Sequence, residues 1–124
     1  MGFPAPVEKI MFSEITVTEL GEKIKSDEKF ILLDVREPDE LVQVKINDSR
    51  LEALPMSRLA REGVNALSEL ARSQETPLYV LCHHGSRSMQ VTGWLLQQGY
   101  KNAINVSGGI DAYARQVDSS IGFY

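Results

Sequence analysis

The chain contains a single cysteine, Cys82, and a run of polar residues that could bind an anion follows it directly. A cysteine is a candidate nucleophile where cationic groups or N–H donors surround it, because they favour the reactive thiolate. A lone cysteine is more often a small buried apolar residue at the end of a strand. The residues after Cys82 favour the chemical role, since they are poor core material: His83, His84, Gly85, Ser86, Arg87 and Ser88.

Four residues of this segment each suit an anion-binding loop for a different chemical reason. Gly85 allows the backbone to bend inward, because no Cβ stands in the way. Ser86 and Ser88 offer hydroxyl groups to an anion. Arg87 carries a forked donor that matches an oxyanion such as a sulfonate. The sequence therefore predicts a binding loop over residues 82–88 with Cys82 at its start.

The two histidines leave two interpretations open. Either His83 or His84 could contact the substrate, or both could be exposed side chains that tune the local charge. A metal site is not expected, because two adjacent histidines rarely face one ion and further ligands are absent. The sequence predicts neither a metal nor a cofactor.

The elements on either side of the loop would position the thiol. Residues 78–82 form an apolar run rich in strand formers, and a helical pattern begins at Ser88 or just before it. The first N–H groups of a helix are unpaired and carry partial positive charge. A strand that ends at Cys82 would therefore deliver the sulfur to a cradle of backbone amides.

A second apolar run, residues 30–35, predicts another strand that is covered on both faces, as in a parallel sheet. Asp34 and Arg36 lie at its carboxyl end, the edge where open α/β sheets form their ligand crevices. We assign them a supporting role, in which Asp34 accepts from turn amides or pairs with Arg36. A carboxylate gains nothing from direct contact with an anion.

The remaining pattern alternates helices with strands. It predicts helices over 17–26, 38–43, 57–72, 88–98 and 110–117. Thr16 and Glu19 would form a capping box at the start of the first helix, and Ser57 would cap the third. A short strand over 15–17 is the alternative at the first of these helices. Further strands are expected over 51–54 and 103–106, an extended lead-in over 1–12 and a tail over 118–124. The Gly108–Gly109 turn would let the backbone pass close to the cysteine loop. The fold class is α/β, one domain over 1–124, with a mostly parallel sheet of about five strands and helices on both faces.

The composition of the chain limits the classes of binding partner and the compartment that we expect for it. The 13 basic residues against 17 acidic ones give a net charge of −4, which argues against a nucleic-acid or membrane surface. A single cysteine excludes an internal disulfide and suits a reducing compartment. The first twelve residues lack the pattern of a signal peptide, and no stretch is apolar for long enough to span a bilayer. A cytoplasmic monomer is expected.

The chain resembles single-domain rhodaneses from about Ile15 to Tyr113. The resemblance rests on the cysteine loop together with segments that span the chain: the helix start at 16–20, Leu-Asp-Val-Arg-Glu-Pro at 33–38 and Val-Ser-Gly-Gly-Ile at 106–110. The tail is more loosely similar to rhodanese domains at the C-terminus of enzymes that activate sulfur carriers. Residues 44–49 depart from the family's Gly-His-Ile-Pro-Gly-Ala, and Tyr113 replaces a frequent tryptophan.

The resemblance implies a sulfurtransferase that carries sulfur as a persulfide on Cys82. A donor such as thiosulfate would load the cysteine, and a thiophilic acceptor such as cyanide or a thiol would unload it. The alternative is a partner-dependent relay, from a cysteine desulfurase to a sulfur carrier or a tRNA-thiolating enzyme. A phosphatase or arsenate reductase is a distant alternative, because those enzymes place five residues between cysteine and arginine, and only four separate Cys82 from Arg87.

Overall fold

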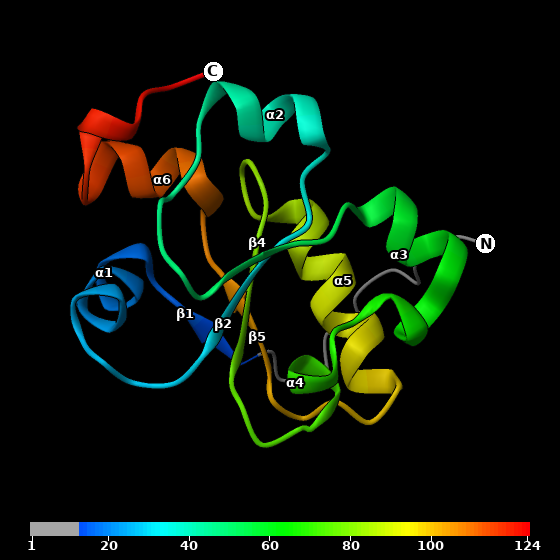
Figure 1. Cartoon of the computed structure of the whole chain (residues 1–124). Helices are drawn as coiled ribbons and strands as arrows, with labels where there is room; N and C mark the ends of the chain where they lie inside the picture. Colours follow the sequence, from blue (N-terminus) through cyan, green and yellow to red (C-terminus); the bar gives the residue numbers. More distant parts are fainter. Residues whose placement is uncertain (1–12) are drawn as a thin grey trace.

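The computed structural model describes residues 13–124, so the lead-in expected over 1–12 lies outside the described residues. Five parallel strands form one sheet in the order β1-β5-β4-β2-β3. Helices cover both of its faces (Figure 1). The predicted α/β class is confirmed, and within residues 13–124 every strand pair is parallel.

The strand that leads to the cysteine lies at the centre of the sheet. This strand, β4, pairs with β5 on one side and with β2 on the other. All four of its residues are buried, as is typical of a central strand in a parallel sheet. In chain order the strands are β1 (Glu14–Ile15), β2 (Ile31–Asp34), β3 (Leu51–Ala53), β4 (Leu78–Leu81) and β5 (Ala103–Val106).

Two apolar cores lie on opposite faces of the sheet, because successive side chains of a strand point to opposite sides. Leu33 and Val80 belong to one core, with residues of α3, α4 and α5. Leu32 and Leu81 belong to the other, with residues of α1 and α6. The helices are α1 (Val17–Lys25), α2 (Pro38–Gln43), α3 (Met56–Glu62), α4 (Glu69–Arg72), α5 (Ser86–Gln97) and α6 (Gly109–Gln116).

The first helix follows its predicted start. Thr16 caps α1, its side chain accepts from the Glu19 amide, and the Glu19 carboxylate accepts from the Thr16 amide. A short strand, β1, also exists just before the cap, at Glu14–Ile15 rather than over 15–17, and Val17 belongs to the helix. Pro38 occupies the first turn of α2, where its missing N–H costs nothing.

The single helix predicted over 57–72 is wrong. Gly63 ends α3 with a φ of 66°, a conformation that glycine adopts readily. A 3₁₀ turn (η1, Gly63–Ala66) and the short helix α4 follow. Pro55, rather than Ser57, is the cap residue of α3, and the Ser57 hydroxyl donates to Glu37 instead.

Among the described helices, none combines the length and the apolar character that crossing a bilayer requires.

Candidate active site

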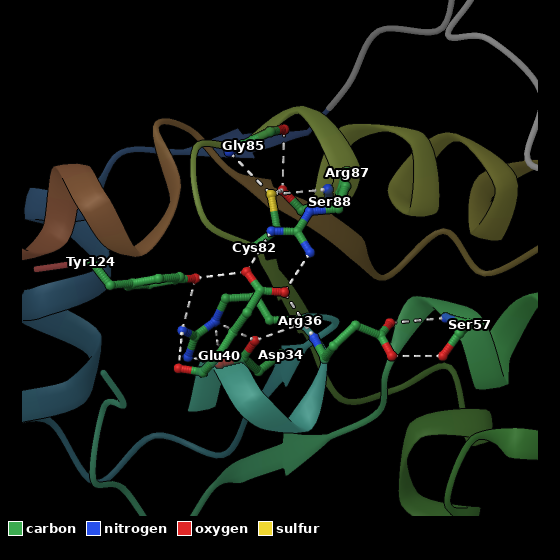
Figure 2. A network of polar contacts seen from close by, with 10 residues as sticks. Asp34, Arg36, Glu40, Ser57, Cys82, Gly85, Arg87, Ser88 and Tyr124 are labelled. Carbon is green, nitrogen blue, oxygen red and sulfur yellow. Dashed lines mark hydrogen bonds and ion pairs between the residues drawn. The ribbon is translucent and has the colours of Figure 1, made fainter. Parts of the chain in front are cut away.

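The thiol of Cys82 lies in a cradle of backbone amides just beyond the end of β4 (Figure 2). The Gly85 amide donates to its Sγ atom at 3.1 Å, and the Ser88 amide does so at 3.3 Å. The thiol donates in turn to the Ser88 hydroxyl at 3.3 Å. These amides point at the sulfur, as the strand–loop–helix pattern predicts, and they can hold negative charge on it.

The helix that closes the cradle, α5, begins at Ser86, just before Ser88 as the sequence pattern allowed. Gly85 precedes α5 with a φ of 103°, so the chain turns directly from the loop into Ser86. A side chain is strained at this φ. This start places the Ser88 amide, in the first helical turn, against the sulfur, where the partial charge of the helix adds to its effect.

A close backbone contact holds the cysteine loop against the start of α6. The amides of Ile110 and Asp111 donate to the carbonyls of Cys82 and His83 at 2.9 and 3.0 Å. A Cβ on Gly109 would overlap both carbonyls. The predicted close passage of the Gly-Gly turn is therefore confirmed, and it ties the start of α6 to the cysteine loop.

Arg87 reaches from the first turn of α5 to Glu40 on α2 (Figure 2). Its two terminal nitrogens donate to the two carboxylate oxygens of Glu40 at 2.7 and 2.8 Å. The hydrogen bonds from Arg87 are the largest influence on Glu40 and lower its pKa to about 2. The same pairing raises the pKa of Arg87. Both groups are therefore charged at neutral pH.

The two supporting residues at the end of β2 form a buried ion pair. Asp34 accepts from the Arg36 side chain at 2.8 Å, and neither residue is exposed. Arg36 also donates to the Tyr124 hydroxyl and to the Glu40 carbonyl. This is the pairing expected for Asp34, and it leaves that carboxylate turned toward Arg36.

Tyr124 connects the tail to the cysteine loop. Its ring stacks on His83, with 3.9 Å between the ring centroids, and its hydroxyl donates to Glu40 at 2.9 Å. Burial is the largest influence on His83 and lowers its pKa. The ring of His84 stacks on the other histidine, while the residue itself is exposed. Ser86 is exposed as well.

One group among the described residues could hold a metal ion: His83, His84 and Asp111, whose ligand atoms lie within 4.8 Å of one another. The two rings stack at an interplanar angle of 23°. Ring nitrogens bind a metal in the plane of the ring, so one ion does not suit both stacked rings. Asp111 also pairs with Arg115. The absence of a metal stays a prediction.

Sequence reasoning missed two residues at the site, Glu40 and Tyr124. The position of Glu40, in the first turn of a helix at the carboxyl edge of the sheet, was a signal that could have found it. The sequence offers no such signal for Tyr124, because its contacts depend on where the tail folds.

The family of the chain follows from its sequence. The sequence model of the rhodanese-like domain matches residues 16–116, which include β4, the cysteine loop and α5. The chain belongs to the rhodanese family.

Two curated relatives and one solved structure illustrate the relationship. A rhodanese-like/PpiC domain-containing protein from Arabidopsis thaliana chloroplasts is 36% identical over 94% of this chain, which spans 39% of that relative. A sulfurtransferase from Allochromatium vinosum is 34% identical over 85% of this chain and 91% of its own length. The crystal structure of a rhodanese-related protein from Thermoplasma volcanium is 31% identical, with a TM-score of 0.68 over 86% of this chain and 94% of that one.

Proposed function

We propose that the protein is a sulfurtransferase that carries sulfane sulfur as a persulfide on Cys82. The amide cradle around the Cys82 sulfur carries this proposal, because a persulfide bears its negative charge on the outer sulfur next to such donors. Membership of the rhodanese family and the relative named a sulfurtransferase support the general activity.

The first step loads the cysteine. The thiolate of Cys82 attacks the outer sulfur of a donor, which is thiosulfate or the persulfide of a thiol. A bond forms between the Cys82 sulfur and the transferred sulfur, and the bond between that sulfur and the rest of the donor breaks. The electron pair leaves with sulfite in the first case and with a thiolate in the second.

The second step removes the transferred sulfur from Cys82. A thiophilic acceptor, such as cyanide or a thiolate, attacks the outer sulfur of the persulfide. The sulfur–sulfur bond breaks, and its electron pair returns to Cys82 as the thiolate. The product is thiocyanate or a new persulfide. The enzyme therefore returns to its starting state without an oxidant or a reductant.

A reducing compartment such as the cytoplasm suits this chemistry, because Cys82 must stay a thiol between cycles. The partners we propose are a small sulfur-containing anion and a thiophilic acceptor. A cysteine desulfurase as the donor and a sulfur-carrier protein as the acceptor would make the same site a relay between proteins.

A transfer assay with the Cys82→Ser variant tests the proposal. The wild-type protein should transfer sulfur from a donor to cyanide, and the variant should transfer none, because Cys82 is the only thiol. The circular-dichroism spectrum and the unfolding midpoint of the variant should stay close to wild type. Residual transfer by the folded variant would contradict the assignment of Cys82 as the carrier.

A further inference from the structure

Three arginines on the described elements around the cysteine loop are each paired with a carboxylate. They lie at the end of β2, in the first turn of α5 and in the last turn of α6. The pairs are Arg36 with Asp34, Arg87 with Glu40, and Arg115 with Asp111. Arg36 is fully buried, so an anionic donor that approaches Cys82 does not reach it, and the arginine of the loop, Arg87, is already paired with a carboxylate.

The pair between Glu40 and Arg87 matters most, because Arg87 is the arginine of the cysteine loop itself. Both carboxylate oxygens are used, at 2.7 and 2.8 Å from the guanidinium nitrogens. The carboxylate also accepts from the Tyr124 hydroxyl and the Glu37 amide, which hold it in place. Its side chain is only 16% exposed.

These contacts affect the two donor classes differently. Thiosulfate is a dianion whose sulfonate oxygens need a forked cation such as a guanidinium. To bind Arg87 it would have to displace the Glu40 carboxylate, or else lie beside that negative charge. A thiol persulfide carries at most one negative charge on the reacting group and has no sulfonate. Its outer sulfur needs only the amide cradle.

We infer that Glu40 determines the sulfur donor: by holding Arg87 it selects a thiol persulfide over thiosulfate. The inference rests on the proposed sulfur transfer through Cys82 and adds the class of donor. Glu40 acts through Arg87, so it is a positioning residue. Specificity is then the ratio of the two kcat/KM values, and that ratio should change when Glu40 loses its charge.

The Glu40→Gln variant tests the inference. It keeps the size of the side chain and a carbonyl oxygen, but it leaves the charge of Arg87 unpaired. We expect kcat/KM for thiosulfate to rise at least about tenfold, since hydrogen bonds from a charged donor are commonly worth that much. With cysteine persulfide as the donor, kcat/KM should change less than about threefold. A misfolded variant would lose activity with both donors.

Two further variants separate this effect from a general change in charge. Asp39→Asn removes the same charge from an exposed neighbour on α2, while Arg87 stays bound to Glu40. It should alter kcat/KM for thiosulfate by less than about twofold, because salt screens an exposed charge. The double variant Glu40→Gln/Arg87→Gln should return to about the wild-type value, because the gain requires the unpaired guanidinium.

A second measurement needs no change at Glu40. In the wild-type protein, kcat/KM for cysteine persulfide should exceed that for thiosulfate at least about tenfold. A desulfurase loaded with persulfide, used in place of the free amino acid, tells whether the preferred donor is a protein or a small thiol.

The results separate the inference from the function on which it rests. Sulfur transfer from neither donor would overturn the proposed function and the inference with it. Transfer from thiosulfate as efficient as from cysteine persulfide would overturn the inference alone. An unchanged thiosulfate kcat/KM in Glu40→Gln, or an equal rise with both donors, would also overturn it and leave the sulfurtransferase in place.

Discussion

The backbone of Gly109 lies directly against the carbonyl of His83, so close that a Cβ on the glycine would overlap it. The amides that follow Gly109 donate to the carbonyls of the cysteine loop. The start of α6 and the loop after β4 therefore form one unit, although they are far apart in the sequence. The geometry around Cys82 depends on this contact.

Replacing Gly109 with alanine should destabilise the protein and disturb the loop. Gly109 has a φ of 64°, and the added Cβ would also meet backbone, which cannot move as a side chain can. We expect the free energy of unfolding to fall by about 3 kcal/mol or more. Urea unfolding measures this change, and sulfur transfer should fall with it.

Gly63→Ala is the matched control. Gly63 has nearly the same φ, 66°, but nothing lies within 4 Å of the position its Cβ would take. Its loss of stability should be limited to backbone strain, about 1–3 kcal/mol, with the activity of the folded protein unchanged. Equal losses for the two variants would show that the contact with the cysteine loop contributes nothing.

Glu40→Gln should lower stability in a way that depends on pH. The pKa of Glu40 falls from 4.5 to about 2 in the folded protein. A group whose pKa falls on folding stabilises the protein above its unfolded pKa, and this contribution is lost as the pH falls toward the folded value. The variant should therefore be less stable by about 1–2 kcal/mol at pH 7.

This difference between wild type and Glu40→Gln should shrink as the pH falls below 4.5. Urea unfolding at pH 7 and at about pH 3.5 measures it. A difference that stays constant over this range would contradict the role of the charged pair.

Removing the Ser88 hydroxyl should slow sulfur transfer. The hydroxyl contacts the Cys82 sulfur and donates to the Gly85 carbonyl at 3.1 Å, so it ties the thiol to the loop. Ser88→Ala should lower kcat/KM about fivefold, which corresponds to one hydrogen bond of about 1 kcal/mol. Ser86→Ala is the control, because Ser86 lies in the same helical turn but is exposed. Equal activities of the two variants would contradict this role.

Tyr124 should determine how His83 titrates. Burial lowers the pKa of His83, and the stacked Tyr124 ring provides part of that cover. Tyr124→Ala should therefore raise the pKa of His83 toward 6.5, whereas Tyr124→Phe, which keeps the ring, should leave it low. Titration followed by NMR measures both. A raised pKa in the Phe variant would assign the effect to the hydroxyl instead.

The sequence predicted those parts of the site that neighbouring residues build. The cradle around Cys82 follows from a strand, a glycine and a helix start within a few residues of one another. Strands β2 and β4 were predictable because both of their faces are apolar. The helix expected across Gly63 was wrong, because apolar spacing continues through a glycine at which the backbone turns away.

The contacts made by distant segments could not be predicted. Glu40 and Arg87 are 47 residues apart, and Tyr124 is 84 residues from Glu40. The forked side chain of Arg87 suggests an anion, but nothing near it in the sequence shows that the anion it holds is a carboxylate of the same chain. Only the folded arrangement of α2, α5 and the tail brings these groups together.

The central claim is that Cys82 carries the transferred sulfur, and intact-mass spectrometry after incubation with a donor tests it most directly. The wild-type protein, treated with cysteine persulfide and then freed of the small molecule, should gain the mass of one sulfur atom on Cys82. Added cyanide should remove it. The Cys82→Ser variant should gain nothing. A wild-type protein that stays unmodified with both cysteine persulfide and thiosulfate, or a variant that gains the same mass, would contradict the account.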